Sequence, residues 1–241
     1  MDSPRVVLIS ISGCSSSGKT TIAKLTSQVF PNSILIHEDD FYKHDEEVPV
    51  DPKHDIRNWD SPEALDFDLF QKELDSIKKT GKIANKLIHN GNVDDLGKFK
   101  LIEKDFTTLT QKYQSVDSVK LVIVDGFMIY NNPDISSKFD VKLFIRAPYE
   151  VLKKRRAARP GYQTLDSFWV DPPYYFDEFV YYSYKASHAP LFVNGNVEGE
   201  LDTSAPLAKD IKVFENDDNT PIVDALTWTC DEIVNFCKAN Y

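Results

Sequence analysis

The most constraining feature of the chain is an apolar run that leads directly into a glycine-rich turn. Residues 6–11 are mostly β-branched, which is typical of a buried parallel strand. The turn matches the pattern G-x-x-x-x-G-K-[ST], and a helical segment is predicted next, at about 19–30. Between a strand and a helix, this pattern predicts a loop whose backbone N–H groups hold phosphate oxygens. We expect the nucleotide phosphates to be bound by Gly13, Cys14, Ser15, Ser16, Ser17, Gly18, Lys19, Thr20 and Thr21.

Four further segments repeat the strand pattern and alternate with helical ones. Strands that alternate with helices predict an α/β fold, here a parallel five-stranded sheet flanked by helices. We expect one domain over residues 1–241, with an insertion at about 82–118 that contains a strand-like run at 98–102. The other predicted strands are 33–37, 120–125, 141–145 and 211–215, and the later helices are 149–159 and 176–188, separated by an aromatic-rich loop at 160–175.

Two helices have clear start signals. Ser61 and Pro62 are predicted to be the N-cap and the first residue of a helix that ends before Gly81. Thr220 and Pro221 have the same spacing and predict the start of the last helix. The first of these helices would direct one apolar face inward, formed by Phe67, Phe70, Leu74 and Ile77.

The composition excludes several classes of protein. The formal net charge of −10 disfavours a nucleic-acid partner, which requires a basic surface. The three cysteines include no CxxC motif, so neither a disulfide framework nor a zinc site is expected. No apolar run has the length of a membrane span or a signal sequence. We therefore expect a cytoplasmic protein with no membrane partner, acting on a small molecule.

Acidic residues stand at the ends of two predicted strands. Asp125 ends the strand 120–125 and precedes Gly126, the arrangement of an acid that orients Mg²⁺; an ordinary turn acid is the alternative. The expected Mg²⁺ ligands are Thr20, Asp39 and Asp125. Lys19 is expected to reach the β- and γ-phosphates of ATP.

The acidic segment EDDFYK follows the strand 33–37. Phosphoryl transfer needs a carboxylate that accepts or aligns the proton of the acceptor hydroxyl, and Asp39 is the candidate for this catalytic base. For Glu38 and Asp40 the favoured interpretation is a solvated acidic loop.

Four segments together resemble the nucleoside-kinase branch of the P-loop kinases: GCSSSGKT, EDDFYK, NWDSPEAL and the strand end DGF. This branch includes the uridine-cytidine kinases and the nicotinamide riboside kinases. Asp40 and the stretch that begins PYEVLKKRRAARPGYQ favour the second group. The resemblance covers about 1–81 and 119–188, but between Arg159 and Asp171 the chain is longer than is usual in the family. It implies a P-loop kinase fold with a helical lid at about 149–176, and phosphorylation of the 5′-hydroxyl of nicotinamide riboside by ATP with Mg²⁺, a step that feeds NAD synthesis.

The resemblance also implies roles for individual residues. Asp39 matches the catalytic acid of the family, and Trp59 and Asp60 match an aromatic–Asp pair that stacks on the base and binds the ribose hydroxyls. Arg156 matches an arginine that also binds the ribose, and Tyr162 matches a lid aromatic on the other side of the base.

Three acids and two arginines complete the expected site. Asp171 and Asp166 compete for the position of a lid aspartate near the base, and Asp125 stands where the family usually has Glu. Like charges at helical spacing repel one another, and a bound polyphosphate would relieve the repulsion in the basic segment 153–159. Its members Arg155 and Arg159 are therefore expected to bind the nucleotide.

Two other functions fit part of the pattern. One is another small-molecule kinase of the same branch, such as a uridine-cytidine or pantothenate kinase. The other is a P-loop nucleotide switch, which needs no acceptor base such as Asp39. Use of nicotinic acid riboside, use of GTP and the oligomeric state are left open.

Overall fold

A parallel sheet of five strands forms the centre of the fold. The computed structural model describes residues 5–85, 103–113 and 119–241. The strand order is β2-β5-β1-β6-β9, which confirms the predicted α/β fold. The strand β1 lies between β5 and β6, so the loop that follows it opens where the strand order reverses, the usual ligand position in such sheets. The strands are β1 (Val6–Ser12), β2 (Ile34–His37), β5 (Lys120–Gly126), β6 (Val141–Arg146) and β9 (Ile211–Glu215).

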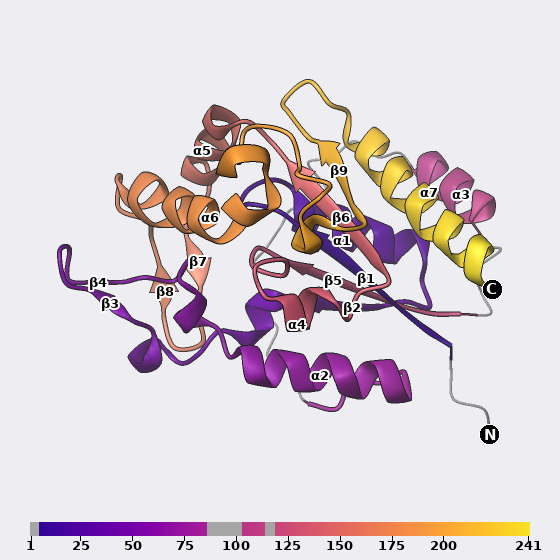
Figure 1. The fold of residues 1–241 in the computed structure, drawn as a ribbon, viewed down its shortest axis with the longest axis horizontal. Helices are drawn as coiled ribbons and strands as arrows, with labels where there is room; N and C mark the ends of the chain where they lie inside the picture. The colour runs from indigo at the N-terminus through magenta and orange to yellow at the C-terminus, as the bar shows by residue number, and fades with distance from the viewer. Residues whose placement is uncertain (1–4, 86–102, 114–118) are drawn as a thin grey trace.

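Helices cover both faces of this sheet, as Figure 1 shows. Successive side chains of β1 alternate between the two layers: Leu8 packs with the apolar face of α2, and Val7 and Ile9 pack with α1 and α7. The helix α3 lies within the predicted insertion and joins the second layer through Leu109. The strand-like run 98–102 falls outside the described residues. The helices in question are α1 (Lys19–Val29), α2 (Phe67–Thr80), α3 (Glu103–Lys112) and α7 (Ile222–Asn240).

The start of α2 differs from the prediction. Ser61 and Pro62 introduce a short 3₁₀ turn, η3 (Pro62–Ala64), and Leu65 then returns to an extended conformation. The helix begins only at Phe67, and the Asp66 carboxylate caps it by accepting a hydrogen bond from the Leu69 N–H at 2.9 Å. The end of the helix agrees with the prediction, because Gly81 takes the left-handed conformation there, with φ 69°.

The last helix also begins later than the sequence predicts. Pro221 is its N-cap, with an extended backbone, and Ile222 is the first helical residue. The Thr220 hydroxyl does not cap the helix, because it donates to the Asp217 carboxylate at 2.9 Å and closes the preceding turn. The predicted start was wrong by one residue for this reason.

Short elements connect the strands, and the hairpins β3–β4 and β7–β8 lie with α5 and α6 at the left of Figure 1. The predicted helical lid is only partly helical: α5 ends at Ala157, and a two-stranded hairpin, β7–β8, occupies the predicted loop 160–175. The helix predicted at 176–188 begins as a π-helix, η6, and continues as α6. These elements are η1 (Glu38–Phe41), η2 (Asp45–Glu47), β3 (Val50–Asp51), β4 (Ile56–Arg57), α4 (Pro133–Ser136), α5 (Tyr149–Ala157), β7 (Tyr162–Gln163), β8 (Phe168–Trp169), η6 (Phe176–Val180), α6 (Tyr181–His188), η7 (Ala189–Leu191), η8 (Val193–Gly195) and η9 (Pro206–Ala208).

Candidate active site

The glycine-rich loop joins β1 to α1 in a conformation that requires its glycines. Gly13 and Gly18 both have positive φ, and a Cβ on Gly13 would lie 2.2 Å from the Ile145 carbonyl oxygen. Asn216, directly after β9, donates from its side-chain amide to the Ser17 carbonyl at 2.7 Å. The loop is therefore held from two other strands of the sheet, with the positive end of α1 beside it.

A pocket opens beside this loop. Most of its wall comes from residues that the sequence singled out, and together they bring a phosphate loop, a carboxylate, an arginine pair and several aromatic rings into one cavity. The lining residues are Ser15, Lys19, Thr20, Asp39, Tyr42, Trp59, Asp60, Phe127, Arg156, Arg159, Tyr162, Gln163, Thr164 and Trp169.

The side of the pocket beside Thr20 centres on Asp125. Its carboxylate accepts a hydrogen bond from the Thr20 hydroxyl at 2.5 Å and a second bond from the His37 ring. Burial alone would raise the pKa of Asp125, but His37 and the Thr20 hydroxyl hold it below the usual value. The side chain is therefore a charged oxygen ligand beside the phosphate loop.

This pair of oxygen donors fits Mg²⁺. In the described part of the chain, no three His, Cys, Asp or Glu side chains group into a metal cage. Mg²⁺ needs none, since it commonly takes one or two protein oxygens together with phosphate oxygens and water. The Thr20 hydroxyl and the Asp125 carboxylate supply such oxygens, and His37 is a partner of Asp125 that sequence reasoning missed.

The acidic residues that follow β2 lie in different environments. Asp39 lines the pocket, and burial raises its pKa although the Lys19 ammonium acts in the opposite direction. The expected solvated position is wrong for Glu38, which is fully buried and accepts hydrogen bonds from the Phe127 and Met128 N–H groups at 2.7 and 2.9 Å. Burial raises the pKa of Glu38 to about 8. Glu38 thus ties the end of β2 to the end of β5.

Arg156 connects the phosphate loop to the acceptor side of the pocket. It is 8% exposed, donates to the Ser15 hydroxyl at 2.8 Å and forms a two-point contact with Asp171 at 2.6 and 3.0 Å. Asp60, which is 4% exposed, lies 3.8 Å from the same guanidinium group. The guanidinium carbon also lies 4.1 Å from the centre of the Tyr162 ring.

The two candidate lid acids occupy different places. Asp171 does not line the pocket itself, but it pairs with Arg156, which does, and it accepts a further hydrogen bond from the Trp169 indole N–H at 2.8 Å. Asp166 does not line the pocket, and its carboxylate instead accepts from the Asp45 N–H at 2.9 Å.

The other residues that were predicted to bind the nucleotide also lie in different places. Arg159 lines the pocket, whereas Arg155 donates to the Asn216 carbonyl at 3.0 Å and pairs with Asp218 outside it. Cys14 is buried behind the loop, where burial raises the pKa of its thiol to about 12, so it remains protonated.

Aromatic rings form part of the pocket wall. Trp59 is 7% exposed, and its ring meets Tyr42 edge to face with 5.8 Å between centres. Tyr42 in turn stacks on Phe127 at 6.1 Å. Sequence reasoning gave Tyr42 and Phe127 no role in the site, although both stand within predicted site segments, EDDFYK and DGF. It also missed Gln163, Thr164 and Trp169 of the hairpin, because a two-residue strand has no periodicity to detect.

Comparison with known proteins gives the family of the chain. Residues 8–162 match the model of the phosphoribulokinase / uridine kinase family. A nicotinamide riboside kinase of Saccharomyces cerevisiae is 66% identical, over 99% of this chain and 100% of that protein. A nicotinamide riboside kinase of Eremothecium gossypii is 51% identical, over 94% and 92%. A uridine kinase of Borrelia hermsii is 35% identical, over 64% and 67%. The chain therefore belongs to the phosphoribulokinase / uridine kinase family, and within it to the nicotinamide riboside kinases.

Proposed function

We propose that the protein transfers the γ-phosphoryl group of ATP to the 5′-hydroxyl of nicotinamide riboside, giving the mononucleotide and ADP. The observation that carries the proposal is the pocket itself, in which Asp39 shares one cavity with Lys19 and with the ring of Trp59. The full-length similarity to nicotinamide riboside kinases supports the choice of acceptor. The product is a pyridine mononucleotide, so the reaction feeds the synthesis of NAD.

The phosphoryl group is held by the loop that begins at Gly13. Its backbone N–H groups and the Lys19 ammonium neutralise the charge of the β- and γ-phosphates, and the arginine Arg159 adds a cation from the lid side. Thr20 and Asp125 are the proposed ligands of Mg²⁺, with the nearby Asp39 as a further acid on that side. These residues would hold the ion where its charge would offset the negative charge that develops on the phosphates.

The acceptor is held on the opposite side. Asp60 and Arg156 form the proposed grip on the ribose hydroxyls, and Trp59 provides a face for the base. Asp39 accepts the proton of the 5′-hydroxyl, whose oxygen attacks the γ-phosphorus. The bond from that phosphorus to the β–γ bridging oxygen breaks, and ADP leaves.

The reaction is proposed to take place in the cytoplasm, with ATP as the phosphoryl donor. All three cysteines are buried and unpaired, as is common in a reducing compartment. The described part of the chain also contains no helix with the length and apolar character of a membrane span.

A coupled assay of ADP release over a panel of nucleosides tests this proposal. We expect ADP to form only when a nucleoside is added, and nicotinamide riboside to give the highest kcat/KM. ADP release without any nucleoside would support a nucleotide switch instead. A higher kcat/KM for uridine would favour the uridine kinases, one of which is also similar to the chain.

A further inference from the structure

The lid of this protein contains a hairpin in the segment between Arg159 and Asp171, where the chain is longer than is usual in the family. The strands β7 and β8 pair through Tyr162 with Trp169 and Gln163 with Phe168. Four of the fourteen residues that line the pocket come from this segment: Tyr162, Gln163, Thr164 and Trp169. The hairpin thus forms part of the wall of the proposed acceptor site.

The tip of the hairpin is fixed to the segment that follows the catalytic-base motif. The Asp166 carboxylate accepts from the Asp45 N–H at 2.9 Å and contacts the His44 ring nitrogen at 3.2 Å. The Ser167 hydroxyl donates to the Asp45 carboxylate at 2.5 Å. The hairpin therefore spans the pocket from the lid to the acceptor side.

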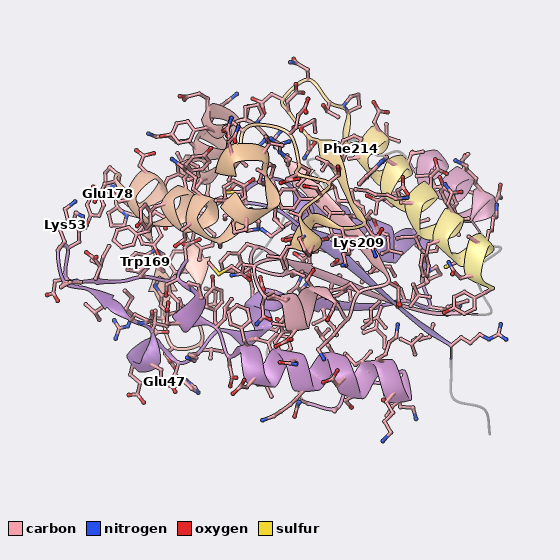
Figure 2. All side chains as sticks on the ribbon, in the orientation of Figure 1. Glu47, Lys53, Trp169, Glu178, Lys209 and Phe214 are labelled. Carbon is pink, nitrogen blue, oxygen red and sulfur yellow. The ribbon has the colours of Figure 1, made fainter. Side chains whose placement is uncertain are left out.

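The base of the hairpin is fixed to the phosphate-loop side. The Trp169 indole N–H donates to Asp171, which pairs with Arg156, and Arg156 donates to the Ser15 hydroxyl. In Figure 2, Trp169 lies on the same side of the molecule as Lys53 and Glu178, away from the sheet. Its ring packs against the Tyr175 ring, with 5.3 Å between centres, and the residue also lines the pocket.

Tyr162, the aromatic residue expected to face the base, is already covered by cations. The guanidinium carbons of Arg156 and Arg159 lie 4.1 and 5.5 Å from the centre of its ring. A ring that faces two cations is a poor partner for a third one, and indole is the side chain that attracts a cation most strongly. Within the hairpin, Trp169 is therefore the better match for a pyridinium ring.

We propose that Trp169 contacts the base of the acceptor and selects for a cationic ring, and that Asp166 is a positioning residue that holds the hairpin in place. This inference rests on the proposed function, because it concerns the acceptor bound in the same pocket. It adds Trp169 to Trp59 and Tyr162 as an aromatic contact of the base.

Steady-state kinetics of three lid variants tests the role of Trp169. We expect Trp169→Leu to raise KM for nicotinamide riboside by about 3- to 30-fold, with a smaller rise for uridine and no change in KM for ATP. Trp169→Phe keeps an aromatic face and is expected to restore most of the loss. A larger selective loss in Tyr162→Leu than in Trp169→Leu would overturn the inference, while turnover of nicotinamide riboside by the wild type would still support the proposed function.

Tryptophan fluorescence gives a binding readout that does not depend on turnover. A pyridinium ring quenches an indole that it contacts, so nicotinamide riboside without ATP should quench the wild type. We expect Trp169→Phe to lose much of this quenching. Trp228→Phe is the matched control. Trp228 packs on Phe214 in the layer that contains α1 and α7, and it does not line the pocket. Equal quenching in the wild type and in Trp169→Phe would contradict the contact.

The positioning role of Asp166 predicts a change in KM that does not depend on the charge of the nucleoside. Asp166→Ala should raise KM for charged and neutral nucleosides alike, by about 2- to 5-fold, since exposed contacts of this kind are weak. Asp166→Asn can still accept from the Asp45 N–H and should restore the wild-type KM. Lys53→Ala removes the contact with Glu178 at 2.5 Å, which lies outside the hairpin. This variant should leave KM unchanged for charged and for neutral nucleosides. An unchanged KM in Asp166→Ala would refute the positioning role.

Discussion

At the scale of single residues, the burial of Asp39 has a kinetic consequence. Burial raises its pKa, so this carboxylate takes up a proton at a higher pH than a solvated aspartate does. The basic form is lost as the pH falls through that raised pKa, and kcat should decline on the acidic side. Asp39→Asn should lower kcat by about 10²- to 10⁴-fold and remove this decline, while ATP still binds.

The neighbouring acid is the control for this prediction. Asp40 accepts from the His37 N–H at 3.4 Å and does not line the pocket. Asp40→Asn should change kcat much less than Asp39→Asn does. Steady-state kinetics from pH 5 to 9 on both variants decides the assignment, and a larger loss in Asp40→Asn would show that the wrong acid was chosen.

The ring of Trp59 should distinguish charged from neutral acceptors. A cation on an aromatic face gains about 0.5–2 kcal/mol, which corresponds to roughly 2- to 30-fold in kcat/KM. Trp59→Leu should therefore reduce kcat/KM for nicotinamide riboside by that amount, and for uridine by less. The measurement is kcat/KM for both nucleosides. An equal loss on both would mean that Trp59 only packs against Tyr42.

At the scale of elements, the ends of β2 and β5 are joined by a buried acid that should affect stability. The pKa of Glu38 is about 8 in the folded chain, against 4.5 for a glutamate that is exposed to water. Between these values the folded chain holds a proton that the unfolded chain has lost, so the free energy of unfolding falls as the pH rises. The expected slope for this group is at most roughly 1.4 kcal/mol per pH unit.

The variant Glu38→Gln should remove this slope. Glutamine has no titrating proton and keeps an oxygen that can accept from the Phe127 and Met128 N–H groups. Urea unfolding at several pH values between 5 and 8 measures the difference from the wild type. Glu63→Gln is the control, because Glu63 is exposed. A slope that is the same in the wild type and in Glu38→Gln would contradict a protonated Glu38.

The elements also show how far the sequence alone can predict this fold. The five strands and the phosphate loop were predictable, because β1, β2 and β5 leave continuous runs of Val, Ile and Leu, and single lysines interrupt the apolar runs of β6 and β9. The start of α2 was not, since Ser61 and Pro62 carry a helix signal that a 3₁₀ turn also satisfies. The burial of Glu38 was not predictable either, because its partners are backbone groups about ninety positions away.

Of the residues in the candidate site, the sequence likewise predicts some positions and not others. The positions of Lys19 and Asp39 in the pocket follow from local motifs at strand ends. Trp169 reaches the same pocket only because the hairpin is held against Asp45 and Arg156, and no local pattern predicts such a contact. Long-range placement of this kind depends on tertiary packing.

At the scale of the whole molecule, the phosphate loop should couple nucleotide binding to stability. A ligand at 100 times its Kd stabilises the folded state by about 2.7 kcal/mol, which for a chain of this size raises Tm by about 5–11 °C. Thermal unfolding with and without MgATP measures this shift. Lys19→Ala should lose most of it, and EDTA should reduce it in the wild type. A full shift in Lys19→Ala would contradict the proposed role of Lys19.

A competition experiment tests the central claim most directly. Nicotinamide riboside and uridine at equal concentrations are supplied together with limiting enzyme, ATP and Mg²⁺, and the two mononucleotides are quantified by mass spectrometry. At early times their ratio equals the ratio of the two kcat/KM values. We expect nicotinamide mononucleotide to be the main product, phosphorylated at the 5′ position. An excess of uridine monophosphate would contradict the assignment of nicotinamide riboside as the acceptor.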